Sequence, residues 1–239
     1  MNFHSQKTNS GIIVYDAAVI EQAGSKLFDG QYWESSGGLA GMAQGRGSAL
    51  FLDTSFGPAV LRRYLRGGWA ARFSRDRYLF TGFERSRPVA EFSILMRLHN
   101  LGLPVPHPLA AQCIRSGLFY SGSLLTRRIL DAAPLADLLE DDRAGLNLWR
   151  ATGKCIRKFH DQGVVHSDLN ARNILVLSTG EIYLIDFDRA RIRKGARRAF
   201  AANLKRLRRS LEKFWPKSDL QRLEESWSSL KLAYADTGS

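Results

Sequence analysis

The sequence predicts an α+β fold of two lobes, in which a small antiparallel β-rich N-terminal lobe precedes a mostly α-helical C-terminal lobe. From Gly37 onward, the first half consists of short β-rich runs separated by glycine turns. The second half instead has apolar residues at helical spacing. With 239 residues, the chain is long enough for two modest lobes with a buried core. We place the N-terminal lobe at residues 1–129 and the C-terminal lobe at 130–239.

The composition is that of an ordinary globular protein, with 44% hydrophobic and 24% charged residues. Cys113 and Cys155 lie in apolar stretches without metal-ligand spacing, which favours reduced thiols in the cytoplasm. The first ten residues are polar and lack the apolar region of a signal peptide. No apolar run approaches the roughly 20 residues that span a bilayer. We therefore expect a cytoplasmic protein, soluble or bound peripherally to a surface.

A glycine turn is the first candidate for ligand binding. Residues 1–35 carry mixed signals, and 19–23 are expected to begin a short helix. Further along, Gly45-Arg46-Gly47-Ser48 is predicted to join two strands, the second at residues 49–52. Gly45 and Gly47 would let backbone N–H groups close over phosphate oxygens with no Cβ in the way. An ordinary hairpin turn is the alternative, and the turn alone does not decide between them.

The next strand and helix predict an ion pair. In the strand at residues 59–64, alternation places Arg62 on one face and Arg63 on the other. In the helix at 89–98, which Pro88 can start, Glu91 lies at the edge of the apolar face. Because an unpaired charge there is costly, we pair Glu91 with Arg62; a solvated glutamate is the alternative. The arginine fork can hold a carboxylate and a phosphate together.

The remaining elements are one hairpin and several helices. Residues 109–114 and 118–130 flank an Arg-Ser-Gly turn and are predicted to form a hairpin. Residues 135–139 and 146–159 have helical apolar spacing, and Gly163 is a plausible C-terminal cap.

The residue types for phosphoryl transfer follow these helices. Asp168, in a loop, can accept a proton from a hydroxyl group, and Asn173 and Asp186 offer hard oxygen ligands for phosphate-bound Mg²⁺. A hairpin of residues 174–177 and 182–185 would bring Asn173 and Asp186 side by side. His166 is expected to support the loop; a catalytic base is its alternative role. The role of Asp188 stays open between a ligand contact and a cap or ion pair.

These motifs resemble a known family. The stretch from His166 to Asn173, with Asp186-Phe187-Asp188, resembles the protein-kinase-like bilobal fold, closer to small-molecule and lipopolysaccharide kinases than to protein kinases. Neither Asp-Phe-Gly nor Ala-Pro-Glu is present. Residues 61–68, 87–92 and 102–108 resemble the 3-deoxy-D-manno-octulosonic acid (Kdo) kinase family, and the resemblance covers roughly residues 30–215.

The resemblance implies ATP-dependent, Mg²⁺-assisted phosphorylation of the Kdo 4-OH on Kdo–lipid IVA, at the cytoplasmic face of a Gram-negative inner membrane. It makes Asp168 the catalytic residue and Asn173 and Asp186 the metal ligands. The nucleotide-binding pair becomes Arg62 and Glu91, because the usual lysine is missing. No lysine occurs between Lys26 and Lys154. A kinase for core heptose, another small molecule or a protein is the close alternative.

A strongly basic segment follows the second acidic motif. Residues 189–213 hold eleven Lys or Arg against Glu212 alone, and the whole chain carries a net charge of +12. An apolar stripe formed by Phe200, Leu204, Leu207, Leu211 and either Phe214 or Trp215 predicts an amphipathic helix. We expect Arg197, Arg198, Arg206 and Arg209 to face lipid phosphates and the anionic inner membrane. A core helix with a solvated basic face is the alternative. A non-catalytic nucleic-acid- or membrane-binding module is more distant, and no nucleic acid is expected as partner, since no such module is recognisable.

Overall fold

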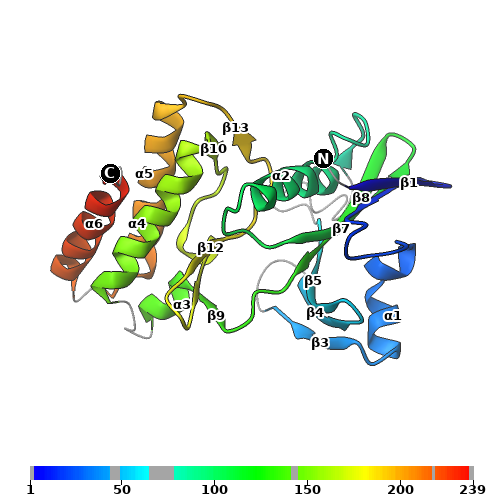
Figure 1. Ribbon diagram of the computed structural model, residues 1–239, viewed down its shortest axis with the longest axis horizontal. Coiled ribbons are helices and arrows are strands. Elements are labelled where there is room, and N and C mark those ends of the chain that lie inside the picture. Colours follow the sequence, from blue (N-terminus) through cyan, green and yellow to red (C-terminus); the bar gives the residue numbers. More distant parts are fainter. Residues whose placement is uncertain (1–2, 44–48, 65–77, 141–144, 217–218, 237–239) are drawn as a thin grey trace. The chain divides into compact units, whose positions relative to one another are not determined.

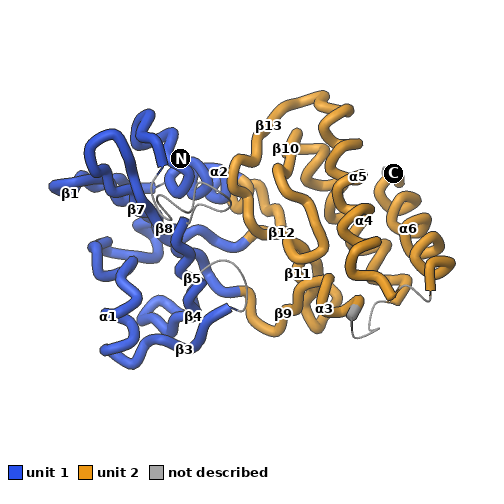
Figure 2. The backbone as a smooth tube through the Cα atoms, turned by 180° about the vertical axis from the view of Figure 1, so that it is seen from behind, with its two compact units in different colours: residues 1–97, 106–128 blue, residues 98–105, 129–239 orange. Residues whose placement is uncertain are grey.

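The structure is a computed structural model that describes residues 3–43, 49–64, 78–140, 145–216 and 219–236. The chain forms two compact units, coloured separately in Figure 2. The first unit comprises Met1–Arg97 and Pro106–Arg128, and the second comprises Leu98–Val105 and Ile129–Ser239. The sequence-based division had placed residues 98–105 and Ile129 in the N-terminal lobe. The predicted glycine turn with Gly45 and Gly47 lies outside the described residues.

The first unit is built on one antiparallel sheet with the strand order β1-β2-β7-β8-β5-β4-β3, in which β6 also pairs with β8 (Figure 1). Its strands are β1 (His4–Thr8), β2 (Gly11–Tyr15), β3 (Leu39–Met42), β4 (Ala49–Thr54), β5 (Gly57–Arg63), β6 (Tyr78–Leu79), β7 (Pro108–Ser116) and β8 (Phe119–Arg127). Its helices are the 3₁₀-helix η1 (Ser25–Phe28), α1 (Gly30–Ser35) and most of α2 (Arg87–Asn100). The predicted hairpin corresponds to β7 and β8, and the predicted helix at 89–98 corresponds to α2.

Alternation along β5 sets the position of Arg62. Ala59 and Leu61 are fully buried in the core of the sheet, together with Leu52 of β4 and Leu125 of β8. Because successive side chains of a strand point to opposite faces, the side chain of Arg62 lies on the face of the sheet opposite to this core.

One expectation for residues 1–35 was wrong, and the sequence analysis missed a strand there. Residues 19–23 do not form a helix: the carbonyl of Asp16 accepts bonds from the N–H groups of Val19 and Ile20, and its carboxylate accepts one from Ala18, which closes a turn instead. The strand β2 was not anticipated, although Ile13 and Val14 are almost fully buried. Its continuous apolar run lacks the alternation that identifies a half-exposed strand.

The second unit is mostly helical, as predicted. Its longer helices, α4 (Leu146–Asp161), α5 (Arg197–Phe214) and α6 (Leu220–Ala235), lie side by side in both views. Its shorter elements are α3 (Leu135–Glu140), η3 (Ala171–Asn173), β9 (Ala132–Pro134), β10 (Val164–Val165), β11 (Ile174–Leu177), β12 (Ile182–Leu184) and β13 (Arg191–Ile192). A Cβ on Gly153 of α4 would lie 2.3 Å from the carbonyl oxygen of Leu230, so this glycine permits the close packing of α4 on α6. The predicted α+β fold, β-rich first and helical second, is confirmed.

The amphipathic pattern of α5 matches its packing. Leu207 and Leu211 are fully buried and Trp215, directly after the helix, is nearly so, whereas most of the basic residues are exposed. No helix within the described residues is long and apolar enough to cross a bilayer.

Candidate functional site

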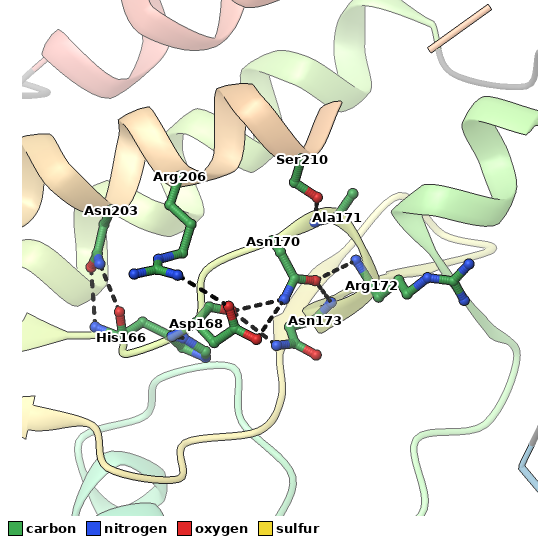
Figure 3. Close-up of polar contacts among 9 residues, drawn as sticks. All are labelled: His166, Asp168, Asn170, Ala171, Arg172, Asn173, Asn203, Arg206 and Ser210. Carbon is green, nitrogen blue, oxygen red and sulfur yellow. Dashed lines mark hydrogen bonds and ion pairs between the residues drawn. The ribbon is translucent and has the colours of Figure 1, made fainter. Parts of the chain in front are cut away.

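Asp168 lies in the loop between β10 and η3 (Figure 3). Its side chain is 58% exposed. Its backbone N–H donates to Nδ1 of His166 at 3.1 Å, and its Oδ2 accepts a hydrogen bond from Nδ2 of Asn170 at 3.0 Å. The carboxylate is therefore accessible to a substrate while the loop around it is held by local hydrogen bonds.

Asn170 joins the loop to the helix that follows it. Its Oδ1 accepts bonds from the backbone N–H groups of Arg172 at 2.9 Å and Asn173 at 3.2 Å, which makes it the N-cap of η3. Its Nδ2 holds the carboxylate of Asp168. Sequence reasoning missed this residue, although an asparagine just before a short helix is a recognisable cap signal.

Asn173 and Asp186 are brought together by the β11–β12 hairpin, as the sequence predicted. Ile174 pairs with Leu184, and the N–H of Ile185 donates to the carbonyl of Asn173 at 3.0 Å, so Asp186 follows directly beside Asn173. Nδ2 of Asn173 donates to the carbonyl of Asp168 at 2.9 Å, which turns its Oδ1 away from the loop (Figure 3).

The oxygens of Asn173 and Asp186 fit Mg²⁺, which takes one or two protein oxygens and completes its shell with phosphate and water. No group of three or more His, Cys, Asp or Glu side chains suited to a metal ion occurs in the described part of the chain. Asp186 also adopts a left-handed backbone conformation, with φ of 62°, a strained state that structures tend to retain at functional sites.

Phe187 and His166 fix this strained position. Phe187 is fully buried and stacks on Phe159 of α4 with 5.7 Å between ring centroids. His166, 3% exposed, packs edge-on against Phe187, and its Nε2 lies 3.0 Å from the carbonyl oxygen of Ile185. Burial lowers the pKa of His166, so the ring is neutral at pH 7; Nε2–H donates to Ile185 and Nδ1 accepts from Asp168. His166 thus links the two acidic motifs, in the supporting role expected for it.

In the first unit, Arg62 of β5 and Glu91 of α2 form the predicted ion pair, with 2.5 Å between Nη2 and Oε2. The side chain of Glu91 is 2% exposed and that of Arg62 is 28% exposed. Tyr64, which the sequence did not single out, donates its hydroxyl to the same Oε2. Burial, with the negative charge of Glu91 beside it, holds the pKa of Tyr64 well above its usual value, so this hydroxyl keeps its proton. Glu91 therefore accepts from both Arg62 and Tyr64 through one carboxylate oxygen.

The four arginines expected to face lipid do not have a common environment. Arg197, Arg198 and Arg209 are exposed on α5. Arg206 is also exposed, but its Nη1 lies 3.6 Å from Oδ1 of Asp168. This contact places Arg206 at the loop that carries Asp168, which no pattern in the sequence indicated.

Comparisons with known proteins find similarity over nearly the whole chain. The model of the lipopolysaccharide kinase (Kdo/WaaP) family matches residues 30–234. Proteins named 3-deoxy-D-manno-octulosonic acid kinase are 44% identical in Xanthomonas euvesicatoria pv. vesicatoria and 43% identical in Stenotrophomonas maltophilia, each over 224 residues that cover 94% of this chain and 89% of the relative. A protein of the same name from Vibrio parahaemolyticus is 35% identical over 233 residues, covering 95% of this chain and 98% of the relative.

Proposed function

Because the chain belongs to the lipopolysaccharide kinase (Kdo/WaaP) family and is a phosphotransferase, we propose that it is an ATP-dependent kinase for the 4-OH of Kdo on Kdo–lipid IVA, in lipopolysaccharide core biosynthesis. The relatives that bear the Kdo kinase name support this acceptor, since they match nearly the full chain. The observation that carries the proposal is the exposed carboxylate of Asp168 next to Asn173 and Asp186.

In the proposed reaction, Asp168 hydrogen-bonds the acceptor hydroxyl and takes its proton as the new O–P bond forms and the bond from the γ-phosphorus to ADP breaks. Asn173 and Asp186 would hold Mg²⁺ through Oδ1 and the carboxylate. Bound there with ATP, Mg²⁺ would supply positive charge against the phosphate oxygens. The hydrogen bonds of Asn170 and Asn173 keep the loop in one conformation, which meets the demand of phosphoryl transfer for positioning.

The nucleotide phosphates are assigned to the first unit. Arg62 keeps its charge at every physiological pH and offers a planar fork, so it can bind Glu91 and a phosphate oxygen at once. This is the role that lysine fills in other kinases of this fold. Gly45 and Gly47 stay predicted contributors of backbone N–H groups.

The acceptor assay tests the function directly. Mass spectrometry of Kdo–lipid IVA incubated with enzyme, ATP and Mg²⁺ is expected to detect one added phosphate, located on the Kdo ring by fragmentation. A heptosylated core acceptor is the matched alternative substrate and lipid IVA without Kdo the control, and neither should gain phosphate at a comparable rate. Phosphate on heptose with none on Kdo would replace the proposed acceptor by the heptose alternative.

We also propose peripheral attachment to the cytoplasmic face of the inner membrane through Arg197, Arg198 and Arg209. These exposed side chains share one helix with the apolar stripe that packs α5 on the second unit. Each basic residue near an anionic surface contributes about 1 kcal/mol, so three can hold the enzyme at the lipid that carries its acceptor.

Vesicle sedimentation checks this attachment. Removing two charges with Arg198→Gln and Arg209→Gln is expected to lower binding to anionic vesicles about 30-fold, from about 2 kcal/mol of lost attraction. The control pair, Arg150→Gln and Lys154→Gln, removes the same charge from exposed positions on α4. Equal losses from both pairs, or binding indifferent to anionic lipid content, would contradict a surface specific to α5.

A further inference from the structure

Three polar side chains on one edge of α5 contact the loop that carries Asp168 (Figure 3). They are Asn203, Arg206 and Ser210, at i, i+3 and i+7, a spacing that aligns side chains along one side of a helix. Leu207, between Arg206 and Ser210 in the sequence, packs into the core, so this edge borders the buried face of α5. The basic helix is therefore also a support for the catalytic loop.

Asn203 holds the loop before Asp168. It is 4% exposed, and its amide pairs with both backbone groups of one residue: Oδ1 accepts from the N–H of His166 at 3.1 Å, and Nδ2 donates to the His166 carbonyl at 2.6 Å. Nε2 of His160, 3.4 Å away, donates to the same Oδ1. Burial lowers the pKa of His160 to about 4, so this ring is neutral and its Nδ1 accepts from the hydroxyl of Tyr234. The amide of Asn203 is thus locked in one orientation.

Ser210 holds the loop after Asp168. Its Oγ accepts a hydrogen bond from the backbone N–H of Ala171 at 3.0 Å. Ala171 is fully buried at the start of η3. The backbone is consequently fixed to α5 on both sides of the catalytic carboxylate, two residues before it and three residues after it.

Arg206 reaches the carboxylate itself. Its Nη1 lies 3.6 Å from Oδ1 of Asp168, while Asn170 donates to the other oxygen, Oδ2. The two side chains are 47% and 58% exposed, so solvent screens the ion pair and the contact contributes little to folding. Its effect lies in orientation, because a partner at each oxygen restricts rotation of the carboxylate about χ2.

We propose that Arg206 is a positioning residue for Asp168, and that α5 supports the catalytic loop through Asn203 and Ser210. The inference rests on the proposed function, since it takes Asp168 as the group that accepts the hydroxyl proton. Arg206 then has a different role from Arg197, Arg198 and Arg209, for which the proposed contact with anionic lipid stands.

Steady-state kinetics on acceptor dispersed in neutral detergent separates the two tasks, because no anionic surface is then present. Arg206→Gln is expected to lower kcat about 10- to 100-fold, since a small misplacement of a catalytic group has effects of this size. KM for ATP and for the acceptor should change less than about twofold, because an interaction used only in the transition state affects kcat. Arg206→Lys should restore part of kcat, because it keeps the charge and loses the fork. The control Lys205→Gln, one residue away and exposed, should leave kcat unchanged.

Two results would overturn the inference. In the first, Arg206→Gln keeps wild-type kcat in detergent and loses activity only on vesicles, which assigns Arg206 to the lipid surface. In the second, KM for the acceptor rises at unchanged kcat, which assigns it to acceptor binding. Melting temperatures within about 2 °C of wild type confirm that the fold is intact. The wild-type enzyme and Asp168→Asn distinguish the levels. A wild-type enzyme that adds no phosphate to Kdo removes the proposed function, and an active Asp168→Asn enzyme removes the proton-accepting role of Asp168. An inactive Asp168→Asn enzyme beside a fully active Arg206→Gln enzyme removes only this inference.

Discussion

Replacing Asp168 by asparagine is expected to lower kcat for phosphate transfer by about 10²–10⁴-fold, the range that general-base catalysis contributes. Asparagine has almost the same shape but cannot accept the hydroxyl proton in this role. Because the side chain is 58% exposed, the change leaves no buried charge and the melting temperature should stay close to that of wild type. The measurement is initial-rate transfer of radiolabelled phosphate from ATP to the lipid acceptor.

Asp161→Asn is the matched control. Asp161 is also an exposed aspartate of the second unit, 2.6 Å from Arg157 one turn earlier on α4, and has no place in the proposed reaction. Its replacement should leave the rate unchanged and cost at most about 0.5 kcal/mol of stability. Turnover by Asp168→Asn at more than a tenth of the wild-type rate would exclude Asp168 as the proton acceptor.

The second large effect is expected at the Arg62–Glu91 pair, where stability and activity should respond differently. Arg62→Met removes the positive charge beside a carboxylate that is 2% exposed, and is expected to destabilise the first unit by about 3 kcal/mol. Glu91→Leu is expected to cost less, about 1–2 kcal/mol, because Arg62 is 28% exposed and can turn toward solvent. Urea unfolding followed by circular dichroism measures both losses.

The double variant is the informative comparison. Arg62→Met combined with Glu91→Leu removes both charges, so its loss of stability should be smaller than the sum of the single losses by at least about 1 kcal/mol. Its KM for ATP should still be raised, because the proposed phosphate contact is gone. Arg62→Lys keeps a charge in place and should retain part of the ATP affinity. Additive stability losses, or unchanged KM for ATP in the double variant, would contradict the ion pair or its proposed phosphate contact, respectively.

Local patterns in the sequence were sufficient for much of the fold and for part of the candidate site. Alternation along β5 put Arg62 opposite the core, and the cost of burying an unpaired charge led to Glu91. The hairpin of β11 and β12 brought Asn173 and Asp186 together because residues close in the chain pair through a short turn. In each case the second residue of the pair could be predicted from side-chain periodicity or from the cost of burying a charge. Both effects are local and do not depend on the particular fold.

The sequence analysis missed other features, because their sequence signals are weak or depend on residues far away in the chain. The strand β2 is an uninterrupted apolar run, which periodicity cannot assign, and the expected helix at residues 19–23 gave way to the hydrogen bonds of Asp16. Tyr64 is separated from Glu91 by 27 positions, and nothing in its neighbourhood indicates a buried hydroxyl.

The sequence by itself determined the α+β class and the presence of a basic amphipathic helix. It also predicted Asp168, Asn173 and Asp186 as the residues for phosphoryl transfer. Only the tertiary structure showed that this helix, α5, holds the loop that carries Asp168. Asn203 lies 37 positions from His166, and Ser210 lies 39 positions from Ala171. Hydrogen bonds over such separations depend on how α5 packs through Leu207 and Leu211, and neither residue type nor spacing encodes that placement. In the sequence Arg206 is one of eleven basic residues between 189 and 213, and its contact with Asp168 distinguishes it from the rest.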